Sequence, residues 1–165
     1  MLRLAILLAV LGPITAAAQR FYFENLSVQQ GLPTSKVYTV LQDSSGLVWL
    51  GTEAGLVSYD GIEPDQLGPD EGTAPGGVRS LLVDREQRLW VGHNGGGISI
   101  GTKQRFGTIT VEGDPITTDI TGIVQDADGA IWITTMGQGV LRFATGTGAG
   151  KAAADRFGQE HGIID

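Results

Sequence analysis

Three stretches of the chain share one pattern of apolar and polar positions. Each begins with a run rich in β-branched residues, passes through a polar turn that opens with Asp, and ends in a second apolar run that contains a Trp. The stretches are 37–51, 78–92 and 120–134. Short apolar runs bounded by turn residues are typical of β-strands rather than helices. The pattern therefore predicts an all-β chain with three copies of one strand–turn–strand unit.

The spacing of these copies predicts their architecture. In each copy the Asp precedes the Trp by six residues: Asp43 and Trp49, Asp84 and Trp90, Asp126 and Trp132. The tryptophans stand 41 and 42 residues apart, and a period of about 40–45 residues with several short strands is typical of β-propeller blades. We expect blades at 37–60, 78–101 and 120–143 within a repeat region of 19–143. Because closed propellers need about four to eight blades, three blades predict a partial propeller.

The polar turn within each copy predicts a hairpin. Its Asp can accept hydrogen bonds from backbone N–H groups ahead of it, and a Gly three residues later can adopt the left-handed conformation without strain. Gly46 and Gly129 fit this rule, whereas Gln87 replaces the Gly in the second copy at a cost on the order of 1 kcal/mol. The run before the Asp is expected to be a buried inner strand, and the Trp is expected to pack between neighbouring blades. The positions assigned to this structural motif are Asp43, Gly46, Trp49, Asp84, Trp90, Asp126, Gly129 and Trp132.

The segments outside the repeats have their own patterns. Residues 1–18 combine an early Arg, an eight-residue apolar run and a small-residue end, which predicts a signal peptide cleaved after Ala18 and an exported, periplasmic or extracellular protein. A membrane-spanning helix would need about 20 apolar residues. Residues 144–156, rich in Gly and Ala, are expected to be a flexible linker. Residues 157–165 resemble the segment around Phe23 and are expected to begin a further blade, and the strand around 21–23 is expected to seek a partner edge.

Composition excludes several classes of protein. The chain has no Cys, which excludes disulfides, thiolate metal sites and Cys nucleophiles. Its 11 basic and 18 acidic residues give a net charge of −7, which argues against binding to nucleic acid. The segment 145–152 resembles a phosphate-binding loop but lacks both the first Gly and the final Ser or Thr. The carboxylates at 126–129 are explained by a β-turn, so no metal and no cofactor is predicted.

Blade topology predicts where a ligand would bind. In an up-and-down blade, the loop entering the first strand and the hairpin between the second and third strands emerge on the same face. On that face the side chains are polar and varied, as expected for binding a polar small molecule or glycan. The candidate ligand-binding residues are Ser35, Lys36, Thr52, Glu53, His93, Asn94, Asp119, Thr135, Met136 and Gln138. No catalytic residue is predicted.

The residues at 31–37 (GLPTSKV) and 42–61 (QDSSGLVWLGTEAGLVSYDG) resemble the two-component regulator propeller repeat. That resemblance extends over most of residues 20–143. It implies the periplasmic sensor part of a hybrid histidine kinase or a diguanylate cyclase, in which a seven-bladed propeller is followed by a β-sandwich, a membrane helix and cytoplasmic signalling domains. The later copies depart from the pattern at Gln87, His93 and Thr134.

Three functions follow from these observations. The first is an extracytoplasmic ligand-sensing module, the amino-terminal part of a sensor whose partners are further blades and membrane-bound signalling domains. The second is an enzyme similar to streptogramin lyases, propellers that use His, Glu and a magnesium ion, for which His93 and Glu53 are the candidates. The third is an exported scaffold that binds protein or polysaccharide. Because no kinase or cyclase segment is visible, we expect the chain itself not to be an enzyme. Self-assembly into a homo-oligomer stays open.

Overall fold

The computed structural model describes residues 24–102 and 105–162, which form three β-sheets, antiparallel except for one short parallel strand. The predicted signal peptide, its cleavage site and the strand around 21–23 lie outside the described residues. In the described part of the chain, no helix has the length and apolar character needed to cross a membrane.

Each sheet contains one four-stranded blade, and the sheet of the second blade has two further short strands. The first blade consists of β1 (Val37–Gln42), β2 (Val48–Thr52), β3 (Gly55–Tyr59) and β4 (Pro64–Leu67). The second consists of β5 (Val78–Val83), β6 (Leu89–His93), β7 (Ile98–Thr102) and β8 (Arg105–Val111). The third consists of β10 (Ile120–Gln125), β11 (Ile131–Thr135), β12 (Val140–Phe143) and β14 (Ala154–Phe157). The predicted all-β partial propeller is therefore confirmed, and each blade extends past its predicted end by one outer strand.

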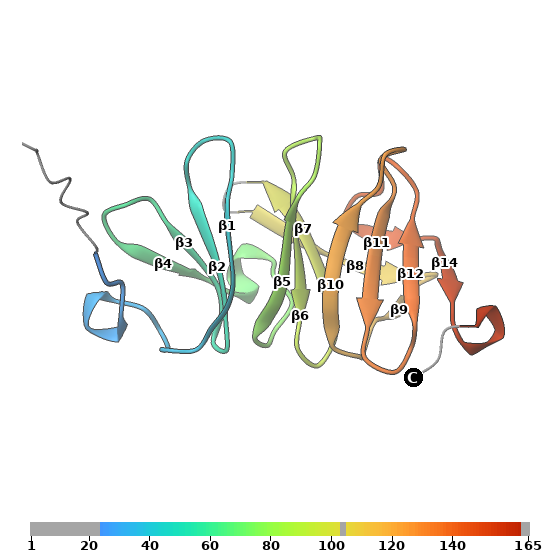
Figure 1. Ribbon diagram of the computed structural model, residues 1–165, viewed down its shortest axis with the longest axis horizontal. Helices are drawn as coiled ribbons and strands as arrows, with labels where there is room; N and C mark the ends of the chain where they lie inside the picture. The colour runs from blue at the N-terminus through green and yellow to red at the C-terminus, as the bar shows by residue number, and fades with distance from the viewer. Residues whose placement is uncertain (1–23, 103–104, 163–165) are drawn as a thin grey trace, which may run out of the picture.

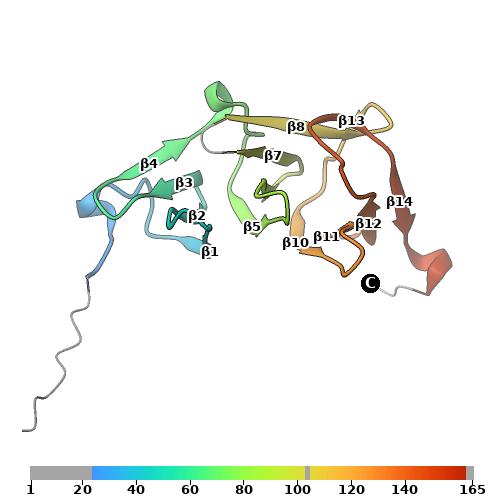
Figure 2. The same cartoon turned by 90° about the horizontal axis from the view of Figure 1, so that it is seen from above.

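The three blades lie side by side in an open arc (Figures 1 and 2). β1, β5 and β10 line the concave side of this arc, and β4, β8 and β14 lie toward its outer side. The prediction that the inner strands are buried was wrong for much of their length, since Val40 on β1 is 65% exposed and Val124 on β10 is 58% exposed. The reason is geometric, because the arc is open and nothing in the described residues faces its concave side.

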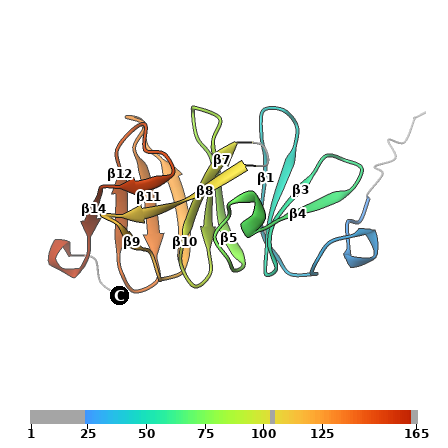
Figure 3. The same cartoon turned by 180° about the vertical axis from the view of Figure 1, so that it is seen from behind.

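The Gly/Ala-rich segment 144–156 is not the predicted flexible linker. It contains β13 (Gly150–Ala152) and most of β14. β14 pairs with β12 as the outer strand of the third blade, whereas β13 pairs in parallel with β8 of the second blade, Lys151 opposite Thr110. Backbone hydrogen bonds to two sheets order the segment despite its composition. We call residues 144–153 the strap, because they connect the third blade to the outer edge of the second (Figures 2 and 3).

The second blade also carries β9 (Asp114–Pro115), which pairs with the end of β8. Figure 3 shows β8 reaching across the outer side of the molecule toward the third blade.

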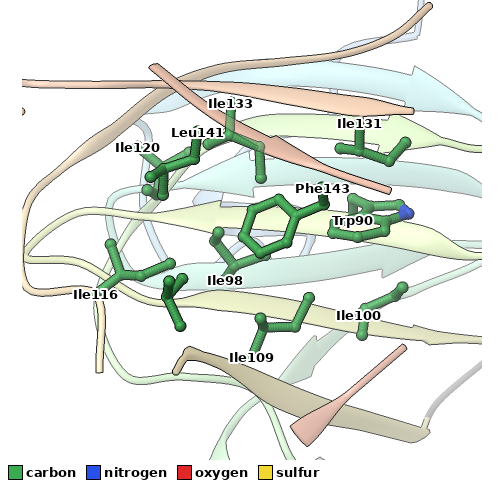
Figure 4. Close-up of a cluster of buried hydrophobic side chains, with 11 residues drawn as sticks. Trp90, Ile98, Ile100, Ile109, Ile116, Ile120, Ile131, Ile133, Leu141 and Phe143 are labelled. Carbon is green, nitrogen blue, oxygen red and sulfur yellow. The ribbon is translucent and has the colours of Figure 1, made fainter. Parts of the chain in front are cut away.

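Packing between blades is centred on tryptophan, as predicted. Trp49 of the first blade is 2% exposed and packs in a cluster with Leu89 and Val91 of the second. Trp90 of the second blade is fully buried among apolar residues of its own blade and of the third (Figure 4). The members of this second cluster are Trp90, Ile98, Ile100, Ile109, Val111, Ile116, Ile120, Ile131, Ile133, Leu141 and Phe143. The blades are thus held together by two apolar seams.

A short 3-10 turn of one kind recurs three times. The turns are η1 (Val28–Gln30), η2 (Pro69–Glu71) and η3 (Gln159–His161). Each ends at a glycine in the left-handed region, Gly31, Gly72 or Gly162. η1 precedes β1, and η2 connects β4 to β5. Phe157 is the last residue of β14, the outer strand of the third blade, so a further blade does not begin at Phe157 itself. That residues 158–165 lead to a further blade stays a prediction.

Candidate functional site

The blades present two opposite faces, which Figure 1 shows at the upper and lower ends of the sheets. One face, which we call the turn face, is formed by the turns between the first and second strands of each blade. The opposite face, which we call the hairpin face, is formed by the hairpins between the second and third strands and by the loops that enter β1, β5 and β10. The ligand-binding candidates belong to the hairpin face.

On the turn face, one hydrogen-bond pattern repeats in every blade. The indole Nε1 of each Trp donates to the Asp six residues before it, over 2.9 Å from Trp49 to Asp43, 2.8 Å from Trp90 to Asp84 and 2.7 Å from Trp132 to Asp126. The second oxygen of each carboxylate accepts backbone N–H groups of the turn. The Trp132 indole and the N–H groups of Ala130 and Asp128 hold the pKa of Asp126 below its usual value. These bonds give the Asp–Trp pair a structural role.

The geometry of the turns agrees with the sequence prediction. Gly46 and Gly129 have positive φ values of 92° and 89°, and Gln87 takes the same left-handed conformation with φ of 61°. The indole bond was not predicted from the sequence, although the constant offset of six residues between Asp and Trp was the signal that could have revealed it.

In the first blade the hairpin face carries an exposed ion pair. Lys36 Nζ lies 2.7 Å from Glu53 Oε1, and this hydrogen bond raises the pKa of Lys36. Ser35 beside it is exposed. The backbone N–H of Glu53 donates to the Lys36 carbonyl over 3.1 Å. The two side chains are thus available to solvent while their backbones are fixed.

Three of the candidates, Thr52, His93 and Thr135, occupy equivalent positions in their hairpins, and their side chains make hydrogen bonds within the protein. Thr52 and Thr135 donate their hydroxyls to the carbonyls of Gly55 and Gly139. His93 in the second blade is 1% exposed, and its ring nitrogens lie 2.9 Å from Ser99 Oγ and 3.5 Å from the Gly76 carbonyl.

Burial lowers the pKa of His93 to about 4, so this imidazole is neutral at pH 7. Thr52 is also fully buried. A ligand on the surface would not reach Thr52 or His93 without a rearrangement, because both side chains already fill the base of their hairpins.

Of the remaining candidates, Asn94 and Asp119 lie where the second blade meets the third, and Met136 and Gln138 lie in the hairpin of the third blade. The backbone N–H of Asn94 donates to the Gly77 carbonyl over 2.7 Å, and that of Met136 to the Asp119 carbonyl over 2.9 Å. The Asp119 carboxylate accepts the N–H of Gly95 over 2.6 Å and so connects the two blades. Asp119 and Asn94 are half-buried, whereas Met136 and Gln138 are exposed.

Gln138 also borders a surface cavity of about 410 Å³ between the third hairpin and η3. Polar and charged side chains, including Arg156 and Glu160, line it together with backbone of the glycines on either side. The candidates therefore do not converge on a single pocket. The exposed ones are Ser35, Lys36, Glu53, Met136 and Gln138.

The lyase alternative finds little support in this arrangement. His93 is buried, with its ring bonded within its own blade, and Glu53 is paired with Lys36. Across residues 24–102 and 105–162, no three His, Cys, Asp or Glu side chains are grouped closely enough to hold a metal ion.

Comparison with known proteins gives one family and one group of structures. The family model described as two component regulator propeller matches residues 31–54 and 114–137. The chain is similar to the extracellular domain of a hybrid two component system from B. thetaiotaomicron, with a TM-score of 0.71, 20% identity and 89% of this chain covered. It is also similar to the extracellular domain of a one component system from the same organism, with a TM-score of 0.66, 23% identity and 82% covered.

These similarities establish the fold. The chain spans about a fifth of the length of each of those solved structures, 20% and 18%. No curated protein matches it.

Proposed function

We propose that this chain, which carries the repeats of the two-component regulator propeller, is part of the extracytoplasmic propeller of a signal-transducing receptor and that its hairpin face binds a polar ligand. Binding there would be transmitted to membrane-bound kinase or cyclase domains through the rest of the receptor. The signal-peptide pattern of residues 1–18 supports a periplasmic or extracellular location.

One observation carries the proposal. Glu53, Asn94 and Met136 occupy the same place in their blades, since each donates its backbone N–H to the residue just before the first strand. Their backbones therefore do the same structural work, yet their side chains are an acid, an amide and a thioether. On the turn face, by contrast, the Asp–Trp pair is identical in all three blades. A rigid scaffold with varied loops on one face is the usual arrangement of a recognition surface.

The chemistry of the exposed residues indicates the class of ligand. Lys36 and Glu53 offer a cation and an anion at 2.7 Å, and Gln138 adds an amide beside a polar cavity. Such groups donate and accept hydrogen bonds without a large apolar surface, which suits a polar small molecule or a glycan.

A binding screen with matched variants tests this proposal. The chain is titrated with a panel of mono- and oligosaccharides and small polar acids, with binding followed by calorimetry. We expect Lys36→Ala and Gln138→Ala to weaken binding of any compound that binds, and Thr108→Ala, an exposed position on β8, to leave it unchanged. Binding that is unchanged by both Lys36→Ala and Gln138→Ala, or absent across the panel, would contradict a ligand site on this face.

A further inference from the structure

The hairpin between β6 and β7 contains the sequence Asn94–Gly95, which the corresponding hairpins of the other two blades lack. The chain has two asparagines, and the other one, Asn25, precedes Leu26. An asparagine followed by glycine is prone to spontaneous deamidation, because glycine has no side chain to hinder the approach of its backbone nitrogen to the asparagine side chain. This hairpin is therefore a candidate site of covalent modification.

The reaction at this bond has two steps and needs no enzyme. The backbone nitrogen of Gly95 gives up its proton and attacks the side-chain carbonyl carbon of Asn94. A C–N bond forms, and the side-chain nitrogen leaves as ammonia, which carries the proton that Gly95 gave up. Water then opens the resulting succinimide ring at one of its two carbonyl groups and leaves aspartate or isoaspartate. Water is the co-reactant, and Gly95 is exposed to it.

The folded structure holds the proton that this reaction must remove. The Gly95 N–H donates to the Asp119 carboxylate over 2.6 Å, which is a short, charge-assisted hydrogen bond. Asp119 belongs to the loop that enters β10, so this bond crosses from the second blade to the third. The carboxylate stabilises the protonated amide and opposes its anion, because the anion would bring a second negative charge against it. The bond to Asp119 therefore works against the attack on Asn94.

The backbone on either side of the reacting bond is fixed as well. The Asn94 N–H donates to the Gly77 carbonyl over 2.7 Å, and the His93 N–H donates to the Gly97 carbonyl over 3.1 Å. Closure of the succinimide ring needs conformational freedom at Asn94 and Gly95. These hydrogen bonds remove that freedom while the second and third blades are in contact, so the reaction has to wait for local opening of the hairpin.

Deamidation places a carboxylate where the structure has room for an amide. Asn94 Oδ1 is buried and has no hydrogen-bond partner in the described part of the chain. A carboxylate there buries part of a negative charge without a donor, which is unfavourable. It also stands next to Gly95, whose N–H holds the Asp119 carboxylate, and two like charges at one contact disfavour each other. The product is therefore expected to weaken the bond between Gly95 and Asp119.

We propose that Asn94 is a site of spontaneous deamidation that the hydrogen bond from Gly95 to Asp119 keeps unreacted while the second and third blades are in contact. We propose further that the reaction, once it has occurred, loosens this contact. Because closing of the blades does not restore the amide, the modified hairpin keeps a chemical record of opening. The inference concerns covalent chemistry and does not depend on ligand binding by the hairpin face.

Peptide mapping by mass spectrometry measures the reaction. The purified chain is incubated in mildly alkaline buffer, and the peptide that contains Asn94 is followed over time. Deamidation adds one mass unit, and chromatography separates the aspartate and isoaspartate forms. Asn25, measured in the same samples, is the internal control, and a synthetic peptide of residues 91–99 gives the rate without the fold.

Three variants separate the role of Asp119 from general loosening of its loop. Asp119→Ala removes the acceptor of the Gly95 N–H, whereas Asp119→Asn keeps an oxygen acceptor without the charge. Thr118→Val is the matched control, because it removes the neighbouring hydroxyl bond to the Met136 carbonyl and leaves the bond from Gly95 to Asp119 in place.

We expect the unchanged chain to deamidate at Asn94 more slowly than the peptide. Asp119→Ala should raise the rate about tenfold, since a hydrogen bond to a charged acceptor is lost, with Asp119→Asn between the two and Thr118→Val at the rate of the unchanged chain. A chain that reacts as fast as the peptide would overturn the protection by the fold. Equal rates for the unchanged chain and both Asp119 variants, or equal acceleration by Thr118→Val, would overturn the role of Asp119.

The effect of the product on the contact is tested with Asn94→Asp. Hydrogen exchange of the Gly95 amide, followed by nuclear magnetic resonance, should be about tenfold faster in this variant than in the unchanged chain, because the bond to Asp119 opens more often. Asn94→Ala, which removes the amide without adding a charge, should change the exchange rate less. Exchange of the Gly95 amide that is the same in Asn94→Asp and the unchanged chain would overturn the loosening of the contact.

Discussion

The Asp84 carboxylate accepts a hydrogen bond from Trp90 Nε1 at 2.8 Å and an ion pair from Arg88 Nε at 2.7 Å, while its side chain is fully buried. Asp43 and Asp126 make the same indole bond without an arginine ion pair, because Leu47 and Ala130 stand where Arg88 stands. The second blade has therefore added a cation that pairs with its carboxylate, whereas the carboxylates of the other two blades are held by hydrogen bonds. Arg88 also donates to the Thr147 carbonyl in the strap at 2.8 Å, so Asp84 anchors a contact between two blades.

We predict that Asp84→Asn destabilises the protein by about 3 kcal/mol, because it leaves the Arg88 guanidinium without its buried partner. Chemical denaturation followed by tryptophan fluorescence measures the change. Asp126→Asn is the matched control, and we expect a smaller loss there, because no buried arginine pairs with this carboxylate. Equal losses at the two positions would show that the ion pair of Asp84 contributes nothing beyond the indole bond.

Protonation of His93 should destabilise the fold in acid. Burial lowers its pKa to about 4 in the folded protein, against 6.5 for the unperturbed group, so the folded state binds a proton less readily than the unfolded state. The stability that comes from keeping His93 neutral is fully present above pH 6.5 and is lost as the pH falls toward 4. The total loss is on the order of 3 kcal/mol in the free energy of unfolding.

The control for this prediction is His93→Thr, because Thr is the residue at the equivalent position of the third blade, Thr135. Unfolding free energies measured between pH 7 and pH 4 should fall less steeply for the variant than for the unchanged protein. Parallel pH profiles would assign the acid sensitivity to the carboxylates instead.

Gln87→Gly should stabilise the protein by about 1 kcal/mol. Gln87 has φ of 61°, a conformation that costs a residue with a Cβ roughly 1 kcal/mol, and the first and third blades have Gly at this position. The side-chain bond from Ser44 to Gln87 would be lost, but both groups are exposed. A lower midpoint of thermal unfolding for the variant would mean that this bond between blades outweighs the backbone strain.

Arg85→Ala should loosen the seam between the second and third blades. Its guanidinium donates hydrogen bonds to the carbonyls of Ala127, over 2.9 Å, and Asp126, over 3.0 Å. Both residues belong to the turn between the first two strands of the next blade. We expect a loss of about 1 to 2 kcal/mol in the free energy of unfolding, since a charged donor is removed. Arg79→Ala is the comparison at the seam between the first and second blades, where the guanidinium lies 5.2 Å over the ring of Tyr38. It should lower the free energy of unfolding by less.

The repeats made most of the fold predictable from the sequence. Three copies of Asp, turn and Trp specify strands, hairpins and blade period together, so the two inner hairpin strands of each blade could be placed from residue types alone. The outer strands could not, because β4, β8 and β14 have little in common in sequence. The strap was misjudged because its strand is held by backbone pairing to β8, a partner that Gly and Ala do not reveal.

The candidate site was predictable to a lesser degree. Loop topology correctly placed the candidates on the hairpin face, but it could not tell exposed side chains from those that fill the hairpins. Thr52, His93 and Thr135 are polar and lie in loops, as a binding residue would, yet they bond to backbone or buried groups of their own blades. Burial of this kind depends on the packing of neighbouring blades, which the sequence of one loop does not contain.

Because of the strap, the second and third blades are joined more strongly to each other than the first blade is to the second. The second and third blades are joined by parallel pairing of β13 with β8, by Arg88 to Thr147 and by Gly95 to Asp119, in addition to their apolar seam. The first blade meets the second chiefly through the cluster around Trp49. Amide protons of β2 and β3 should therefore exchange with deuterium before those of β6, β7 and β11, because opening at one seam is easier than at a seam crossed by backbone bonds. We therefore expect the strap to make the second and third blades unfold together and the first blade to open before them.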